Sequence, residues 1–228
     1  MSYLRDFINL IYPNTCLTCG KSLPGKELYV CPRCWMDMPK TNFHKEPGNK
    51  VEQIFWGRFP IENGTSFFYY TKGSSYQKLI HEMKYNNKKE IGYILGKKFG
   101  RELENSAFKQ TDYLVPVPLH KKKLRKRGFN QSERIARGIS DALGIPVSED
   151  NLYRSEYTKS QTKKSRHERW KNVENVFTLR NRDTFENKRL LLIDDILTTG
   201  ATLEACANAL LESKGAVVSI ATLGFADN

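Results

Sequence analysis

Residues 190–202 read Leu-Leu-Leu-Ile-Asp-Asp-Ile-Leu-Thr-Thr-Gly-Ala-Thr and constrain the fold more than any other part of the 228-residue chain. The apolar run at its start is typical of a strand that is buried on both faces of a sheet. The Thr-Thr-Gly turn then leads into a helical pattern of apolar residues. A buried strand, a short turn and a helix form the repeating unit of α/β proteins, so the segment predicts an α/β fold.

Strand-like and helical segments alternate along the rest of the chain. The expected strands are residues 66–71, 113–117, 189–194 and 217–223, and the expected helices are residues 76–85, 91–103, 130–143 and 202–213. Asn130 stands where it can cap the third helix, and Gly144 stands where that helix ends. This order predicts a parallel sheet covered by helices on both faces. No apolar run exceeds four residues, far short of the ~20 that cross a bilayer.

The turn that follows the buried strand has the chemistry of a phosphate-binding site. Hydroxyls and backbone amides gather there at the start of a helix, where anions bind, and a glycine lets the main chain close around the anion. Two adjacent carboxylates, which only accept hydrogen bonds, precede the turn and suit the paired hydroxyls of a sugar. The segment therefore predicts a site for a phosphorylated ribose, with Asp194 and Asp195 on the ribose hydroxyls. The residues predicted around the phosphate are Thr198, Thr199, Gly200, Ala201 and Thr202.

Two other kinds of nucleotide site do not fit the sequence. It contains no G-x-x-x-x-G-K-[ST] motif, and no G-x-G-x-x-G motif follows a strand. A plainer interpretation makes the acid pair a solvated strand end and the threonines a helix cap. We favour the binding site because strand, acid pair, Thr/Gly turn and helix follow one another within thirteen residues.

Four of the five cysteines form two C-x2-C pairs separated by eleven residues: Cys16, Cys19, Cys31 and Cys34. Each pair can direct two thiolates at one tetrahedral ion, and four thiolates complete a structural Zn²⁺ site with no open position. The alternative, a pair of disulfides, is less expected in a chain without a secretion signal. Cys206 lies on the apolar side of an expected helix, which indicates a core residue.

The zinc module defines a predicted domain boundary near residue 50. Apolar residues recur at helical spacing in residues 3–11 and end at Pro13, which predicts an amphipathic helix before the first cysteine pair. A Pro- and Gly-containing stretch at residues 40–50 separates this module from the rest. We therefore predict an N-terminal helix and four-cysteine module in residues 1–50 and the α/β domain in residues 51–228. We also expect the protein in the cytoplasm.

Positive charge is concentrated in two segments. The formal net charge is +12, and residues 119–137 and 159–171 carry +7 and +5 of it. A charge run can be a solvated face, but two separate runs in an otherwise neutral chain favour a polyanionic partner. Diphosphates, phosphorylated sugars and nucleic acids all have the required chemistry.

The thirteen-residue segment resembles the phosphoribosyl-diphosphate (PRPP) loop of type I phosphoribosyltransferases, and the chain as a whole resembles the ComF/GntX branch of that superfamily. The four-cysteine N-terminus, residues 116–120 leading to residues 127–131, and residues 161–177 also carry the resemblance. It implies the type I phosphoribosyltransferase fold, a parallel sheet flanked by helices, with the acid pair on the ribose 2′- and 3′-hydroxyls. It also implies PRPP as ligand together with Mg²⁺, and a role in DNA uptake during natural transformation.

The resemblance also suggests tasks for the two basic segments. The loop after an earlier strand, residues 120–128, would face the diphosphate, and a mobile loop at residues 157–171 would close over the sugar. Arginine can meet a diphosphate bidentately. The candidates for contacts with the diphosphate are Lys121, Lys122, Arg125, Arg127, Arg166 and Arg169.

Three functions remain open at this point. The first is a Mg²⁺-dependent enzyme that transfers phosphoribosyl groups from PRPP to an acceptor, which the sequence does not identify. The second is a PRPP-responsive protein that binds single-stranded DNA, because residues 121–127 hold more positive charge than one diphosphate requires. The third is a scaffold that acts through the zinc module with partner proteins of the competence machinery.

Overall fold

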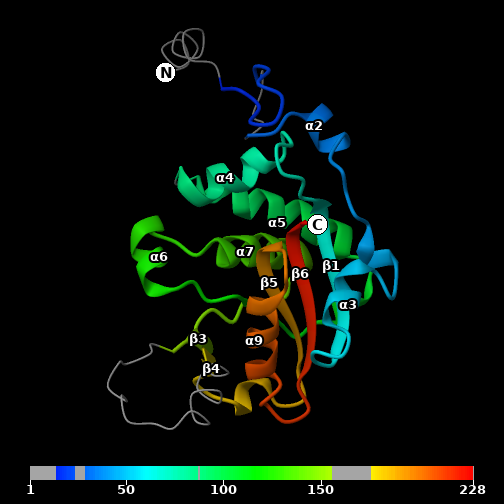
Figure 1. Ribbon diagram of the computed structural model, residues 1–228, viewed down its shortest axis with the longest axis vertical. Coiled ribbons are helices and arrows are strands. Elements are labelled where there is room, and N and C mark those ends of the chain that lie inside the picture. The colour runs from blue at the N-terminus through cyan, green and yellow to red at the C-terminus, as the bar shows by residue number, and fades with distance from the viewer. Residues whose placement is uncertain (1–13, 24–28, 87, 156–175, 228) are drawn as a thin grey trace.

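A four-stranded parallel sheet forms the centre of the computed structural model, which describes residues 14–23, 29–86, 88–155 and 176–227 (Figure 1). The strands are β1 (Ile61–Tyr69), β2 (Tyr113–Pro116), β5 (Arg189–Leu197) and β6 (Val217–Phe225), in the order β1-β6-β5-β2. Every neighbouring pair is parallel. The predicted α/β architecture is therefore confirmed.

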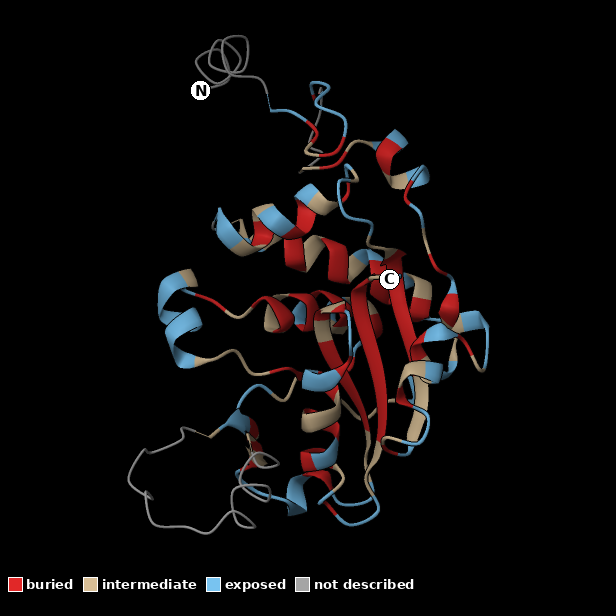
Figure 2. Cartoon of the chain, viewed as in Figure 1, coloured by how far each residue is buried: buried red, intermediate tan, exposed pale blue. Residues whose placement is uncertain are grey.

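Helices cover both faces of this sheet. One face carries α4 (Gln77–Tyr85), α5 (Lys89–Leu103) and α7 (Gln131–Leu143), and the other carries α3 (Lys50–Phe55) and α9 (Ala201–Leu210). Strand β5 shows how the sequence makes two cores: Leu191 and Ile193 face the first, while Leu190 and Leu192 face the second. Successive side chains of a strand point to opposite faces, so a continuous apolar run fills both cores (Figure 2).

The remaining elements are short. They are α2 (Pro32–Met36), α6 (Lys121–Arg127), the antiparallel pair β3 (Leu152–Arg154) and β4 (Phe177–Leu179), and the 3₁₀ turns η1 (Phe43–Lys45), η2 (Ala107–Gln110) and η3 (Asp183–Phe185). None of the described helices is long and apolar enough to cross a membrane. The helix expected before the first cysteine pair lies outside the described residues.

The structure differs most from the sequence predictions in two segments. The first strand begins at Ile61 rather than residue 66, because its parallel pairing with β6 starts at Ile61 and, after an irregularity in register, continues from Gly64 despite the low strand propensity of glycine. The basic segment expected as a loop at residues 120–128 is the helix α6. Lys and Arg favour helices, the His120 side chain accepts a bond from the Lys122 amide, and Gly128 ends the helix with φ at +75°.

Helices α5 and α7 pack unusually closely, and this contact positions the start of α7. A Cβ atom at Gly96 would lie 2.2 Å from the carbonyl oxygen of Ile135, and one at Gly138 would lie 2.1 Å from that of Tyr93. Only glycine allows the two backbones to approach in this way. As predicted, the Asn130 side chain caps α7 by accepting a bond from the Ser132 amide, and Gly144 ends the helix with positive φ.

Candidate functional site

The predicted acid pair lies beside a gap in the sheet. Strand β2 pairs with β5 only as far as Ile193, where the Val117 amide makes the last bond at 2.9 Å. Strand β5 itself continues to Leu197, three residues past the predicted end, through its pairing with β6. Asp194 and Asp195 therefore stand on β5 where its other neighbour has turned away. Ligands of open α/β sheets bind in such crevices at the carboxyl ends of strands.

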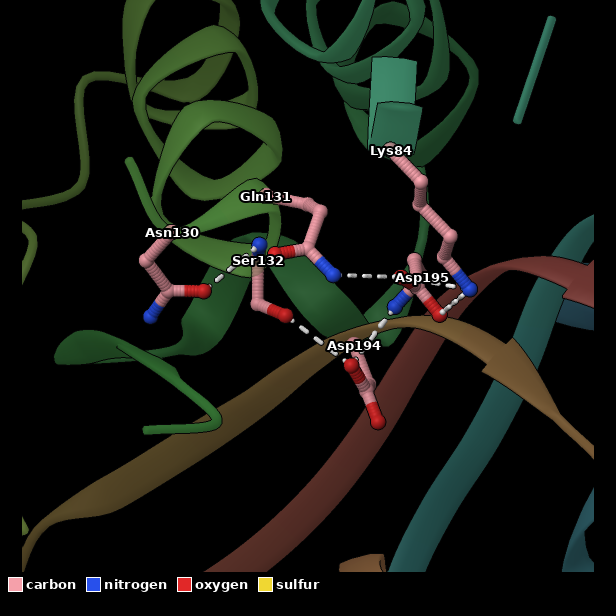
Figure 3. Close-up of polar contacts among 6 residues, drawn as sticks. All are labelled: Lys84, Asn130, Gln131, Ser132, Asp194 and Asp195. Carbon is pink, nitrogen blue, oxygen red and sulfur yellow. Dashed lines mark hydrogen bonds and ion pairs between the residues drawn. The ribbon is translucent and has the colours of Figure 1, made fainter. Parts of the chain in front are cut away.

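Asp194 accepts two hydrogen bonds on one carboxylate oxygen. The Ser132 hydroxyl donates to Oδ1 at 2.9 Å, and the backbone amide of Asp195 donates to the same atom at 2.8 Å (Figure 3). Withdrawal from water raises the pKa of this carboxyl group well above its usual range, and the neighbouring charge of Asp195 raises it further. The two hydrogen bonds oppose this shift only in part.

Asp195 is buried and is bonded through both carboxylate oxygens. Lys84 Nζ lies 3.0 Å from Oδ1 and 2.9 Å from Oδ2, and the Gln131 amide donates to Oδ2 at 3.1 Å (Figure 3). Lys84 comes from the end of α4 and Gln131 from the start of α7. The two acids, three residues from the helices and the cap Asn130 thus form one polar cluster.

A cavity of about 180 Å³ opens over this cluster. Two carboxylates, Asp194 and Asp195, line it, and its other described polar residues are cationic or neutral. The lining residues are Lys84, Val117, Pro118, Leu119, His120, Lys123, Arg127, Gln131, Ser132, Arg154, Asp194, Asp195 and Thr202. We call it the ribose cavity, after the ligand that the sequence predicts. It contains the acid pair, whose chemistry suits hydroxyl groups, and four cations, whose chemistry suits phosphates. We call these cations, Lys84, Lys123, Arg127 and Arg154, the basic wall.

The predicted phosphate turn follows β5 directly. Gly200 adopts a positive φ of 78° and precedes the first residue of α9, while Thr198, Thr199, Ala201 and Thr202 are exposed. Among the described residues, none accepts a hydrogen bond from the amides of residues 198–202. The Arg58 guanidinium holds the turn by donating a hydrogen bond to the Thr199 carbonyl oxygen at 2.8 Å. Only Thr202 of the five predicted phosphate residues lines the ribose cavity.

The predicted diphosphate residues separate into three groups. Arg127 lines the ribose cavity, whereas Lys121, Lys122 and Arg125 are on α6 but do not line it. Arg166 and Arg169, with the proposed mobile loop at residues 157–171, lie outside the described residues.

Several cavity residues were missed by the sequence reasoning, among them Lys84, Gln131, Ser132 and Arg154. Lys84 and Arg154 are single basic residues in unremarkable segments, and nothing in the sequence near them indicates a site. Gln131 has a weak signal, because it directly follows the helix cap Asn130 within the first basic segment. A basic or amide side chain becomes a site residue here only through the packing of α4, α7 and β3 around β5.

The four cysteines of the N-terminal module come together as predicted. Their sulfur atoms all lie within 4.8 Å of one another, and the Cys19 and Cys31 Sγ atoms are 3.9 Å apart. Four sulfurs bound to one tetrahedral Zn²⁺ at about 2.3 Å are about 3.8 Å apart, so the donors fit the ion in number, chemistry and spacing. Such a site has no open position and is structural. Cys206 is fully buried in α9, and burial raises the pKa of its thiol well above the usual value.

Comparison with known proteins agrees with both modules. The phosphoribosyl transferase domain family matches residues 125–226, and the double zinc ribbon domain family matches residues 7–47. The DNA utilization protein YhgH of Salmonella typhimurium is 27% identical over 209 residues, which cover 90% of this chain and 87% of that protein. Competence protein ComFC of Bacillus subtilis is 39% identical over 111 residues, which cover 48% of this chain and 43% of that protein.

A solved structure of glutamine PRPP amidotransferase from B. subtilis matches with a TM-score of 0.41 and 22% identity, over 57% of this chain and 26% of that one. The fold assignment rests instead on the strand order, the matched domain families and the cysteine cluster. The chain therefore has a type I phosphoribosyltransferase fold behind a four-cysteine zinc ribbon, and its similarity to competence and DNA utilization proteins agrees with the resemblance to the ComF family.

Proposed function

We propose that the ribose cavity binds PRPP together with Mg²⁺. The observation that carries this proposal is the position of the acid pair at the open edge of β5, in a cavity that basic residues also line. The carboxylates of Asp194 and Asp195 accept bonds from the ribose 2′- and 3′-hydroxyls. The 5′-phosphate meets the free amides of residues 198–202, including that of Thr202 at the cavity wall.

The basic wall supplies the charge that a diphosphate requires. Lys123, Arg127 and Arg154 line the ribose cavity, and the diphosphate is their proposed ligand. The proposed mobile loop would add Arg166 and Arg169, and Lys121, Lys122 and Arg125 would contribute from α6. Mg²⁺ is commonly bound by one or two carboxylates together with substrate phosphates, and Asp194 Oδ2, which has no hydrogen bond to a described residue, suits this role.

Transfer of the phosphoribosyl group needs no nucleophile from the protein. The leaving diphosphate requires neutralisation, and the sugar must be held beside its acceptor, so binding and positioning account for the chemistry. We propose this transfer as the reaction class. The acceptor attacks the anomeric carbon, and the diphosphate departs with the electron pair of the broken bond.

Calorimetric titration with PRPP and Mg²⁺ tests the binding proposal. We expect the Asp194→Asn/Asp195→Asn double variant to lose PRPP affinity while it keeps its fold, because each asparagine retains one acceptor but loses the negative charge. Asp150→Asn, at an exposed position outside the ribose cavity, is the matched control and should bind normally. Equal affinity of the double variant and the native protein would overturn the site assignment. Release of diphosphate across a panel of purine and pyrimidine bases tests the transfer step.

The relatives suggest the biological setting. Their names refer to DNA utilization and competence, and we propose that this protein acts in the cytoplasm in DNA uptake during natural transformation, with partner proteins of that machinery. We also propose residues 1–50 and 51–228 as its two functional modules.

An alternative function is supported by α6. None of the seven residues of this basic helix is buried, so the helix presents positive charge at the surface, where neighbouring phosphates of a strand can approach it. A PRPP-responsive protein that binds single-stranded DNA would use this surface without any transfer. This function predicts that the affinity for an oligonucleotide falls steeply as the salt concentration rises, and falls further in Lys122→Gln. Such behaviour, together with no release of diphosphate from PRPP, would favour this function over the enzyme.

A further inference from the structure

A second cavity, of about 670 Å³, lies between the end of α4, the start of α5 and α6. We call it the α4–α6 cavity. Six cations line it: Lys84, Lys89, Lys123, Arg125, Lys126 and Arg127. Among the described residues that line it, none carries a carboxylate. Its volume falls within the ~300–1,000 Å³ that is typical of small-molecule sites.

Only some of the cations in the α4–α6 cavity also line the ribose cavity. Lys84, Lys123 and Arg127 line both cavities, so the two spaces adjoin. The other three cations, Lys89, Arg125 and Lys126, line the α4–α6 cavity alone. Like charges gathered in a concave site repel one another unless an anion is bound among them. Three cations outside the ribose cavity therefore indicate phosphate groups beyond those of the sugar ligand.

An aromatic wall stands beside these cations. Tyr85 is 62% exposed, which is unusual for a ring of this size, and the guanidinium of Arg127 lies 5.4 Å from its centroid. Phe129 lines the same space. Exposed aromatic rings and arginine planes stack on nucleobases, while lysine and arginine bind phosphates. Both halves of a nucleotide find a complementary surface in this one cavity.

We propose that the α4–α6 cavity, which adjoins the ribose cavity, binds a nucleotide. The base lies against Tyr85 and Arg127, and the phosphates lie among Lys89, Arg125 and Lys126. This site is built from side chains that do not contact Asp194 or Asp195, except for the shared Lys84. The acid pair therefore takes no part in this site, although Lys84, Lys123 and Arg127 line both cavities.

Titration of the full-length protein with ADP, followed by calorimetry, tests the proposal. We expect Lys89→Gln/Lys126→Gln to weaken ADP binding about tenfold and to leave PRPP binding within about twofold of the native value. The matched control is Lys72→Gln/Lys214→Gln, which removes the same charge from exposed positions that line neither cavity. The control should bind ADP within about twofold of the native protein, because charges that far from the ligand are screened by salt.

Two further variants separate the possible outcomes. Tyr85→Ala, at an exposed position, should weaken ADP but not inorganic tripolyphosphate, because the latter has no ring to stack. Asp194→Asn/Asp195→Asn should keep its ADP affinity. Loss of ADP binding in Asp194→Asn/Asp195→Asn, or unchanged ADP binding in Lys89→Gln/Lys126→Gln, would overturn the proposal. An equal decrease in the affinities for ADP and tripolyphosphate in Tyr85→Ala would overturn it as well. ADP binding without PRPP binding would refute the proposed function and leave this inference standing.

Discussion

Lys84 and Asp195 form the most enclosed ion pair that we describe at the ribose cavity, with side chains 19% and 10% exposed. Asp195 also accepts a bond from Gln131, so its charge is balanced by one cation and one amide. A buried ion pair gives little net stability, but removal of one partner leaves an uncompensated charge away from water. Lys84 therefore holds the Asp195 side chain in position beside the ribose cavity.

We predict that Lys84→Met lowers the free energy of unfolding by about 2–3 kcal/mol, because Asp195 then keeps its charge without a cation. Urea denaturation at neutral pH measures this loss. The double variant Lys84→Met/Asp195→Asn should recover most of the stability, since no unpaired charge remains. An equally unstable double variant would show that Lys84 acts through packing and not through the ion pair.

The raised pKa of Asp194 leads to a separate prediction about how the stability of the protein depends on pH. Its pKa is raised in the folded protein, first by withdrawal from water and then by the charge of Asp195. Between the unfolded pKa near 4 and the raised folded pKa, the folded state binds more protons than the unfolded chain, so this group's contribution to stability falls as the pH rises through that window. The neutral amide of the Asp194→Asn variant would carry no such cost.

The melting temperature of Asp194→Asn should therefore exceed that of the native protein at pH 8 by about 2–4 °C, which corresponds to about 1 kcal/mol, and the difference should disappear below pH 4. Calorimetric scans across this pH range measure the effect. Asp150→Asn, at an exposed site, should show no such trend. A native protein that is more stable than Asp194→Asn at pH 8 would contradict the prediction.

At the scale of whole elements, the contact between α5 and α7 determines where the site residues of α7 lie. Gln131 and Ser132, which bond to the two acids, stand at the first turn of α7, and its glycine contact with α5 fixes that helix. A shift of the helix by the width of one methyl group would move both donors. The fold thus couples a close backbone approach to the geometry of the cavity.

Gly96→Ala should lower the free energy of unfolding by about 2 kcal/mol. The added Cβ would lie 2.2 Å from the Ile135 carbonyl oxygen, and this overpacking outweighs the gain of about 1 kcal/mol in helix propensity. Gly92→Ala is the matched control on the same helix, because its nearest neighbour is the flexible Met83 sulfur at 2.9 Å. The melting temperature and the PRPP affinity should both fall further in Gly96→Ala than in Gly92→Ala. Equal decreases in the two variants would mean that the close approach of the backbones does not cause the destabilisation.

At the scale of the whole molecule, the zinc ribbon and the α/β domain share a core. Cys16 and Cys34 belong to the same cluster of buried side chains as Leu95 and Phe99 of α5. The Tyr76 hydroxyl, just before α4, also donates to the Cys34 carbonyl at 2.8 Å. Loss of the metal should therefore disturb the face of the sheet that carries α4, and not only the ribbon.

We predict one Zn²⁺ per chain in the native protein and none in Cys34→Ser after purification, measured by atomic absorption. The Cys34→Ser variant, or the native protein treated with a chelator, should melt at a lower temperature because the metal contributes folding energy. Cys206→Ala should keep its zinc, since Cys206 lies in α9 outside the cysteine cluster. Full zinc content in Cys34→Ser would contradict the assigned ligands.

Several features could be predicted because the interactions that produce them are local in sequence. The strand, acid pair, turn and helix of residues 190–202 are contiguous, and two C-x2-C pairs direct their own thiolates at one ion. The caps at Asn130 and Gly144 depend on the neighbouring turn alone. The prediction of a loop at residues 120–128 is wrong for a local reason as well, since Lys and Arg have high helix propensity and residues 121–127 form a helix.

Hydrophobic periodicity and short spacings are sufficient to predict the α/β architecture, the four clustered cysteines and the acid pair at the end of a buried strand. The surroundings of those acids depend instead on contacts between distant parts of the chain. Lys84 and Asp195 are 111 residues apart, and Gln131 and Asp195 are 64 apart. Such pairs form only when helices pack onto a sheet, since side-chain packing over long separations leaves no periodic signal in the chain.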